Sequence, residues 1–279
     1  MSAATAALLR LELAEALRSR WAVFTGIVYG LLFAGFVWLG LRESSVLGFT
    51  GLSRVVLNLA NAIVLAVPLV ALVATCQVIV KARQSGFFEL VLSQPVRRQA
   101  WFTSAVGSRF LVVVGPLVAL FFAALLASVL GAQRDGALAA IVARSLAVTV
   151  SLAWAFIGLG FWISARARTA ERATVLALVA WAGAAALHDF ALIGTLLRFK
   201  LAPQAVFALA AINPVETARI AVLGGVDPEL SVLGPVGFWL SSTLGPGLTL
   251  GAGIAWPALL GTLALYLARR RLGASDLVG

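Results

Sequence analysis

The stretch that decides the fold is "VVLNLANAIVLAVPLVALVATCQVIV", residues 55–80, in which 26 consecutive residues carry no charge. A helix needs about 20 predominantly apolar residues to cross roughly 30 Å of hydrocarbon. Its backbone satisfies its own hydrogen bonds, as a lipid-facing segment must. The alternation of apolar and polar residues that a barrel strand would show does not occur here. The stretch therefore predicts a transmembrane helix.

The rest of the chain has the same character. Of 279 residues, 62% are hydrophobic and 11% are charged, and the mean hydropathy is +1.03. The charged fraction is less than half of the roughly 25% found in soluble domains. The sequence predicts an all-α integral membrane protein with a single transmembrane domain, residues 1–279, and no second soluble domain. Six spans are expected, at residues 21–41, 55–80, 110–130, 141–163, 173–193 and 248–268.

The distribution of lysine and arginine predicts the orientation. Cytoplasmic flanks of membrane spans accumulate these residues. The N-terminus, the loops after the second and fourth spans and the C-terminus together hold 14 of the 21 cations, against 7 on the other side. Both termini are therefore expected in the cytoplasm, in a bacterial-type inner membrane. The cations lie in twos and threes at span ends, so the net charge of +10 indicates contact with lipid head groups and not with nucleic acid.

The composition also argues against several kinds of chemistry. One histidine, one cysteine and one methionine cannot supply a site of soft or imidazole metal ligands, so no metal site is expected. A phosphate-binding loop needs a lysine after a glycine-rich turn. Neither Lys81 nor Lys200 follows a glycine, so the chain is not expected to bind ATP itself.

Two amphipathic segments lie at the expected cytoplasmic side. In residues 1–20, Leu9, Leu13 and Leu17 recur every four residues, and the charged residues fall mostly on the remaining surface, which predicts an interfacial helix. The second segment, "GFFELVLSQPVRR", lies in the loop 81–101. As a helix it would align Phe87 with Leu90 and end at Pro95. A solvated loop whose arginines only fix the topology is the alternative.

The second segment resembles the coupling helix of ABC-2 type permeases, which typically reads G-T-L-E-L-L-L-S-x-P-x-x-R. The matching residues are Gly86, Glu89, Leu90, Leu92, Ser93, Pro95 and Arg98. The resemblance implies that this helix docks on a separate ATPase, with Arg97 as a further contact. It also implies a second copy of the chain and two ABC ATPase subunits, which would bind the ATP and Mg. Relatives commonly carry an acidic residue before the glycine, where this chain reads "KARQS", so local contacts with the ATPase are expected to differ.

Two further strings, "VLGFTGL" (46–52) and "INPVETARIAVLGG" (212–225), are similar to the permease of the transporter that helps to mature nitrous oxide reductase. This narrower resemblance implies a role in maturing that copper enzyme, and a periplasmic accessory protein as a partner. Members of the wider family mostly export their substrates, which implies outward transport here.

The expected outer side holds two undecided features. His188 and Asp189 lie in the outer third of the fifth span, where they either line a pathway or touch interfacial water. The segment 194–248 contains five prolines and should form short helices that are either re-entrant or surface-lying. In "NPVETARIAVLGG", Asn213 is the expected N-cap, with Pro214 first in the helix and Gly224 at its end.

Three other functions remain as alternatives to an ATP-driven permease. A secondary transporter would require an ion site near the bilayer centre, yet Asp189 is the only acidic residue expected inside a span. A membrane anchor would bind its partner without transporting anything. An intramembrane enzyme is the weakest alternative, because Ser151 and Ser164 lie on another span than the one histidine.

Overall fold

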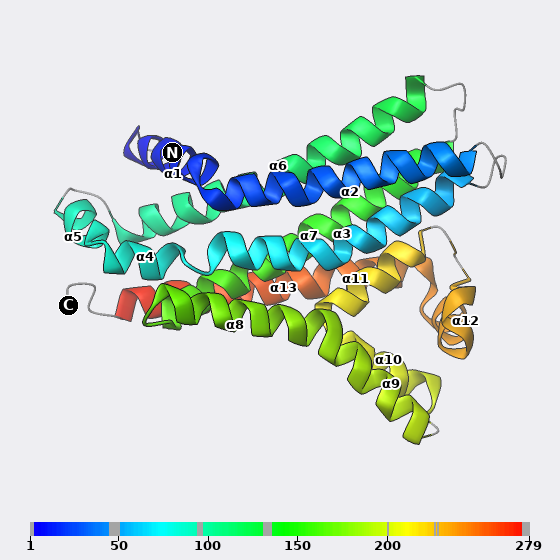
Figure 1. The fold of residues 1–279 in the computed structure, drawn as a ribbon. Helices are drawn as coiled ribbons and strands as arrows, with labels where there is room; N and C mark the ends of the chain where they lie inside the picture. Colours follow the sequence, from blue (N-terminus) through cyan, green and yellow to red (C-terminus); the bar gives the residue numbers. More distant parts are fainter. Residues whose placement is uncertain are drawn as a thin grey trace.

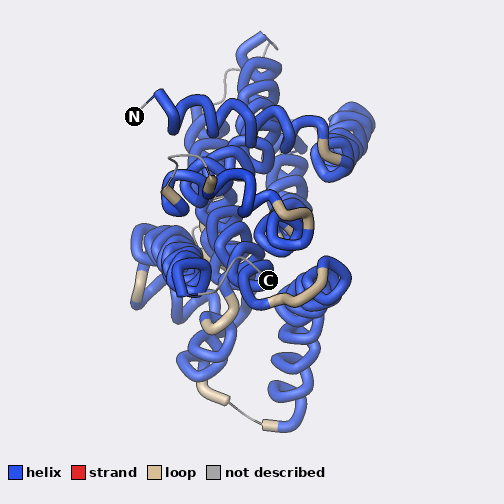
Figure 2. Tube along the Cα trace, turned by 90° about the vertical axis from the view of Figure 1, so that its left-hand side faces the viewer, coloured by secondary structure: helices blue, strands red, loops and turns tan. Residues whose placement is uncertain are grey.

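The protein is described by a computed structural model covering residues 3–44, 51–93, 97–130, 136–199, 201–225, 227 and 229–274. These residues form helices and connecting turns, and none of them lies in a strand (Figure 2). The first helices are α1 (Ala3–Arg18), α2 (Arg20–Ser44), α3 (Gly51–Thr75), α4 (Val78–Gln84), α5 (Phe87–Leu92), α6 (Arg98–Leu130) and α7 (Gly136–Arg166). The later ones are α8 (Ala170–Ala182), a π-helical turn (Gly183–Leu187), α9 (His188–Arg198), α10 (Pro203–Ala211), α11 (Pro214–Leu223), a 3₁₀ turn (Ser231–Leu233), α12 (Gly234–Thr243) and α13 (Gly245–Ala274).

The long helices run side by side and form an elongated bundle (Figure 1). In the described part of the chain, five helical stretches are long and apolar enough to cross a membrane, which confirms the all-helical membrane fold. They are Ala62–Gln84, Arg98–Ala123, Ala139–Arg166, Ala170–Arg198 and Gly245–Gly273. The expected first span, 21–41, falls within α2, but many side chains in its second half lie outside the described residues.

Helices α10 and α11 form a bent pair outside this regular set. Their axes turn by 118° at the break between them, as in a broken span or a re-entrant loop. α11 is not a surface helix, because almost all of its residues from Val215 to Leu223 are buried, against α3, α7 and α13. Asn213, Pro214 and Gly224 occupy the expected cap, first and end positions of α11.

Glycines bring α7 close to its neighbours in the core. A Cβ added to Gly158 would lie 2.9 Å from the Cα of Gly261 in α13, and one added to Gly160 would overlap the side chain of Thr75 in α3. Without a hydrophobic driving force between helices in lipid, such close backbone approach supplies the packing energy of the bundle.

The second span is not one continuous helix, as the sequence analysis had assumed. α3 ends at Thr75 and α4 begins at Val78. The Thr75 hydroxyl donates back to the carbonyl oxygen of Ala71 at 2.6 Å. Across the break, the Ser164 hydroxyl oxygen of α7 accepts from the amides of Ile79 and Val80 at 2.9 and 3.1 Å. A side chain from another helix thus stabilises the start of α4, where helical amides lack an internal acceptor.

The two ends of the bundle differ. α1, α5 and the last turns of α13 lie at one end, whereas α12 lies at the other (Figure 1). Viewed from the first end, α1 runs across the bundle and not along it (Figure 2). This placement of α1 is what a helix in the membrane interface requires.

Candidate coupling site and outer charge cluster

The short helix α5 projects from the end of the bundle that also carries α1 (Figure 1). Gly86 starts it from a left-handed backbone with φ of +70°, a conformation that glycine adopts without steric cost. The amides of Glu89 and Leu90 donate to the Gly86 carbonyl oxygen and form the first turn. Gly86 therefore sets the angle at which α5 leaves α4.

Phe88, and not Leu90, anchors α5 to the bundle. The Phe88 side chain is 3% exposed, and its ring lies 4.7 Å from that of Trp101 in α6, in an edge-to-face contact. The neighbouring Phe87 ring lies 6.2 Å from the same tryptophan. The residue that packs on the bundle is thus one that the expected stripe leaves out, whereas Leu90 of that stripe is 70% exposed. In a helix of only six residues, the packing of Phe87 and Phe88 on Trp101 decides which side of the helix faces the bundle. The spacing of apolar residues along the helix does not decide it.

Trp101 extends this contact to α1. Its indole nitrogen donates a hydrogen bond of 2.6 Å to a carboxylate oxygen of Glu12, and both side chains are buried. Burial raises the pKa of Glu12, and the hydrogen bond from Trp101 offsets this only in part. The sequence analysis had placed the charged residues of α1 mostly on its exposed side, but Glu12 faces the bundle.

α4 is fastened on its other side to α7 and α8. Besides the two amides capped by Ser164, the Gln77 amide nitrogen donates to the hydroxyl of Thr174 in α8 at 2.6 Å. The Arg83 guanidinium donates to the carbonyl oxygen of Ala165 at 3.4 Å. The segment that carries α5 therefore contacts three other helices, α6 through Trp101 and α7 and α8 through α4 and Gln77. Through Trp101 it is also linked indirectly to α1.

The described residues among those expected to couple to an ATPase lie in or next to α5 and around the start of α6. Glu89 and Leu90 lie together on the exposed edge of α5, whereas the side chain of Leu92 and all of Pro95 lie outside the described residues. Arg97 is exposed just before α6. Arg98 lines a separate cleft of about 430 Å³ together with Tyr266 and other residues at the end of α13.

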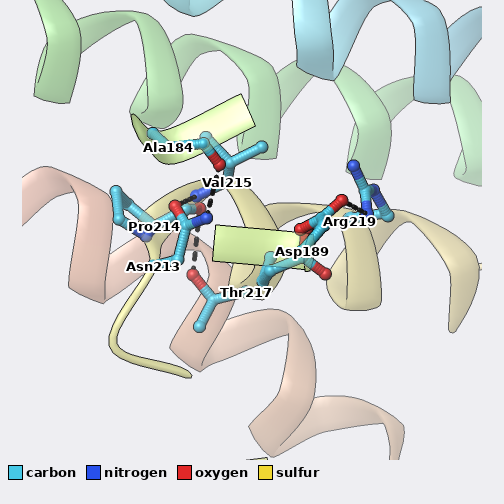
Figure 3. Close-up of polar contacts among 8 residues, drawn as sticks. Ala184, Asp189, Asn213, Pro214, Val215, Thr217 and Arg219 are labelled. Carbon is cyan, nitrogen blue, oxygen red and sulfur yellow. Dashed lines mark hydrogen bonds and ion pairs between the residues drawn. The ribbon is translucent and has the colours of Figure 1, made fainter. Parts of the chain in front are cut away.

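A charge cluster lies where α9 meets α11. The Arg219 guanidinium is 3.2 Å from an Asp189 carboxylate oxygen and 2.8 Å from one of Glu216 (Figure 3). All three side chains are partly buried, with 25%, 30% and 12% exposed. The Nε2 atom of the adjacent His188 is buried and has no hydrogen-bond partner in the described part of the chain. Asp189 is thus part of an ion-pair network and does not simply face interfacial water.

A π-helical turn immediately precedes this cluster. Residues Gly183–Leu187 continue α8 into α9, so the fifth span does not end near His188 but runs as a helix to Arg198. Asn213 donates from its amide nitrogen to the Ala184 carbonyl oxygen at 2.6 Å (Figure 3). Its side-chain oxygen accepts from the amide of Val215 and so caps α11. One side chain therefore ties the π turn, which often marks functional positions in helices, to the buried helix α11.

Sequence reasoning missed Trp101, Glu216 and Arg219 as site residues. For Arg219 and Glu216 a signal existed, because a cation three residues after a carboxylate in a helix shares its face. For Trp101 no such signal existed. Its partner Glu12 is 89 residues away in sequence, and the expected stripe through Phe87 and Leu90 left Phe88 out.

Comparisons with known proteins agree with this architecture. The family described as "ABC-2 family transporter protein" matches residues 6–267. The chain is 28% identical over 273 residues, 94% of its length, to the "Probable ABC transporter permease protein NosY" of Stutzerimonas stutzeri, of which it covers 97%. It is 29% identical over 222 residues to the protein of the same description from Pseudomonas aeruginosa, with 78% of this chain and 81% of that one covered. This chain is an all-helical membrane bundle that the family matches over nearly its whole length, and it belongs to the ABC-2 transporter permeases.

Proposed function

We propose that this chain moves a substrate outward across a bacterial inner membrane, as a dimer driven by two ABC ATPase subunits through α5. ABC transporters bind ATP in their ATPase subunits, so the permease is the non-catalytic membrane subunit and works with an ABC ATPase. The observation that carries the proposal is the structure of α5. Its edge with Glu89 and Leu90 is exposed, while its other side is fixed to Trp101.

This arrangement would let α5 transmit a movement of the ATPase. An ATPase bound to the exposed edge of α5 would displace Trp101 and hence α6 and α1. The same movement would reach α7 and α8 through α4, where Ser164 and Thr174 hold it. The break between α3 and α4 would allow α4 and α5 to move relative to α3. In this assignment α1, α5 and both termini face the cytoplasm, where the ATPase is.

The exposed apolar surface of α8 and α9 supports pairing with a second copy. Only 6% of the most apolar window in Ala170–Arg198 is buried within the chain. Such a helix must contact lipid or another subunit, and we assign the contact to the second copy. A translocation pathway between the two copies would then pass His188 and Asp189.

The narrower role rests on the relatives. Similarity to NosY over nearly the whole chain supports a part in the maturation of nitrous oxide reductase, with a periplasmic accessory protein at the end that carries α12. The segment 194–248 would form the periplasmic side, with α10 and α11 as a re-entrant pair.

The test is the substitution of Glu89 by lysine, with the permease reconstituted together with its ATPase in vesicles. We expect stimulation of ATP hydrolysis by the permease to be lost while the protein remains folded and inserted. Leu90→Ala should weaken stimulation as well, and should not lower thermal stability, because this side chain is 70% exposed. Thr103→Lys is the control, since it introduces the same lysine side chain at an exposed position of α6, with a charge change of one unit where Glu89→Lys makes two. Stimulation that survives both changes in α5 would rule out coupling through this helix.

A further inference from the structure

A cavity of about 510 Å³ lies behind the coupling helix, between α1, α4 and α6. Its lining includes two cations, two carboxylates and two tryptophans, which are Lys81, Arg109, Glu12, Glu15, Trp21 and Trp101. The proposed coupling function does not use this space.

Arg109 is the unusual member of the lining. Its side chain is 8% exposed, and its Nε atom has no hydrogen-bond partner in the described part of the chain. No ion pair of Arg109 or Lys81 occurs among the described residues either. A buried guanidinium without a direct ion pair is costly. Glu12 and Glu15 lie close enough to act on the charge of Arg109, but neither is within ion-pair distance, which leaves the Nε–H group for a ligand in the cavity.

The nearby carboxylates do not supply that partner. Glu12 already accepts the indole hydrogen bond of Trp101, and burial raises its pKa, which lessens the negative charge facing Arg109. Glu15 lines the cavity without forming an ion pair in the described residues. Its carboxylate acts on Arg109 at longer range and can also accept from a positive group of a bound molecule.

We place the cavity at the depth of lipid head groups, because aromatic and basic residues gather at this end of the bundle. Arg109 is the twelfth residue of α6, one residue before the expected start of the third span and within the apolar stretch Arg98–Ala123. The same end of the bundle has Arg166 stacked 5.1 Å from the Trp162 ring and Arg270 stacked 4.9 Å from the Tyr266 ring. Aromatic and basic residues of this kind mark the interface between head groups and hydrocarbon.

A second cavity, of about 660 Å³, continues the first past shared residues. Ser19, Trp21 and Lys81 line both, and Arg18 and Phe24 line only the second. A polar pocket with one buried guanidinium therefore leads to aromatic side chains at the start of α2, Trp21 and Phe24. A head group with acyl chains attached fits this succession better than a soluble anion.

We propose that this cavity binds the phosphodiester of a membrane phospholipid, with Arg109 and Lys81 donating to its oxygens. Guanidinium groups bind phosphate oxygens through paired, charge-assisted hydrogen bonds. The ammonium of an ethanolamine head group would donate a hydrogen bond to the Glu15 carboxylate. The bound lipid would fill the space between α1 and α6 and thereby add a contact between the interfacial helix α1 and the segment of α4 and α5.

The test measures lipid binding by the full-length chain in mild detergent. Native mass spectrometry follows phospholipid retained during stepwise delipidation, and a short-chain phosphatidylethanolamine serves as the soluble probe. We expect the wild type to retain phospholipid, and Arg109→Gln to weaken binding of the probe by about tenfold or more. Arg166→Gln removes an equivalent arginine outside the cavity and should bind as the wild type does.

Inorganic phosphate distinguishes the two sources of a phosphate group. It should not displace the lipid probe at equal concentration. Phosphate that binds as tightly as the probe and competes with it would overturn the lipid assignment, and equal lipid binding by wild type and Arg109→Gln would overturn the site. If Arg109→Gln does not fold, Arg109→Lys and Lys81→Gln replace it, and unchanged lipid binding in both overturns the site equally.

Discussion

The indole nitrogen of Trp101 lies 2.6 Å from a carboxylate oxygen of Glu12, and the same indole packs edge-to-face on Phe88. One side chain of α6 thus holds the interfacial helix α1 on one side and the coupling helix α5 on the other. Both contacts are buried. Movement of α5 therefore cannot leave α1 undisturbed without breaking one of them.

Replacing Trp101 by phenylalanine separates these two contacts. The variant keeps an aromatic ring against Phe88 but leaves the Glu12 carboxylate buried without its donor. We expect a loss of about 1–3 kcal/mol of stability, the typical penalty for such an unsatisfied group. Thermal unfolding in detergent measures it. Trp101→Ala, which also removes the ring, should cost clearly more, and equal costs for the two variants would show that the ring contact with Phe88 contributes nothing. Unchanged stability of Trp101→Phe would show that the hydrogen bond to Glu12 contributes nothing.

The buried carboxylate of Glu12 predicts a dependence of stability on pH. Burial raises its pKa above the ordinary value of 4.5, so the folded state binds this proton more tightly than the unfolded state does. The resulting stabilisation is complete below about pH 4.5 and is lost as the pH rises through the raised pKa in the folded protein. Glu12→Gln cannot titrate but can still accept from Trp101. The difference in thermal midpoint between this variant and the wild type should therefore change across that range of pH, and a constant difference would contradict the assignment.

The sequence predicted the membrane helices well because their signal is physical and local. A run of 26 uncharged residues such as 55–80 has one stable conformation in lipid. The break after Thr75 could not be predicted in the same way. It depends on Ser164, which lies 85 residues from Ile79 in sequence and replaces the missing helical acceptor.

The coupling residues are predicted from a motif alone. Gly86 and Glu89 belong to a short string that resembles a known helix, and a short helix does follow Gly86. The outer cluster needs α9 and α11 to meet, and Asp189 and Arg219 are 30 residues apart. A hydropathy profile treats each span alone and therefore does not predict a contact between α9 and α11.

Loss of the Ser164 hydroxyl should loosen the start of α4. Ser164→Ala leaves the amides of Ile79 and Val80 without their acceptor, at a cost of about 1–3 kcal/mol. Hydrogen exchange provides the local measurement, since these two amides should exchange faster while α6 is unaffected. Ser241→Ala, which removes an exposed hydroxyl bonded within its own helix, is the control. Unchanged protection at Ile79 and Val80 would show that the break is stabilised in another way.

Close contact between α7 and α13 predicts a sharp difference between two glycines. A Cβ at Gly158 would lie 2.9 Å from the Cα of Gly261, whereas one at Gly26 in α2 has nothing within 4 Å. Gly158→Val should therefore force the two helices apart and destabilise the protein by about 1–3 kcal/mol or more. Gly26→Val makes the same chemical change without that clash. Comparison of the two thermal midpoints tests the packing, and similar midpoints would contradict it.

Removal of Arg219 should harm the protein more than removal of Asp189. Arg219→Gln leaves the carboxylates of Asp189 and Glu216 without the cation that both contact, whereas Asp189→Asn leaves Arg219 paired with Glu216. Because the three groups are only partly buried, we expect about 1–2 kcal/mol for Arg219→Gln, less than for a fully buried pair. The double variant should recover part of this loss, since the neutral amide introduced by Asp189→Asn no longer repels Glu216. Thermal unfolding of the two single variants and the double variant gives the coupling energy. An additive result would mean that the two side chains do not interact, and would remove the reason to place Asp189 in a functional cluster.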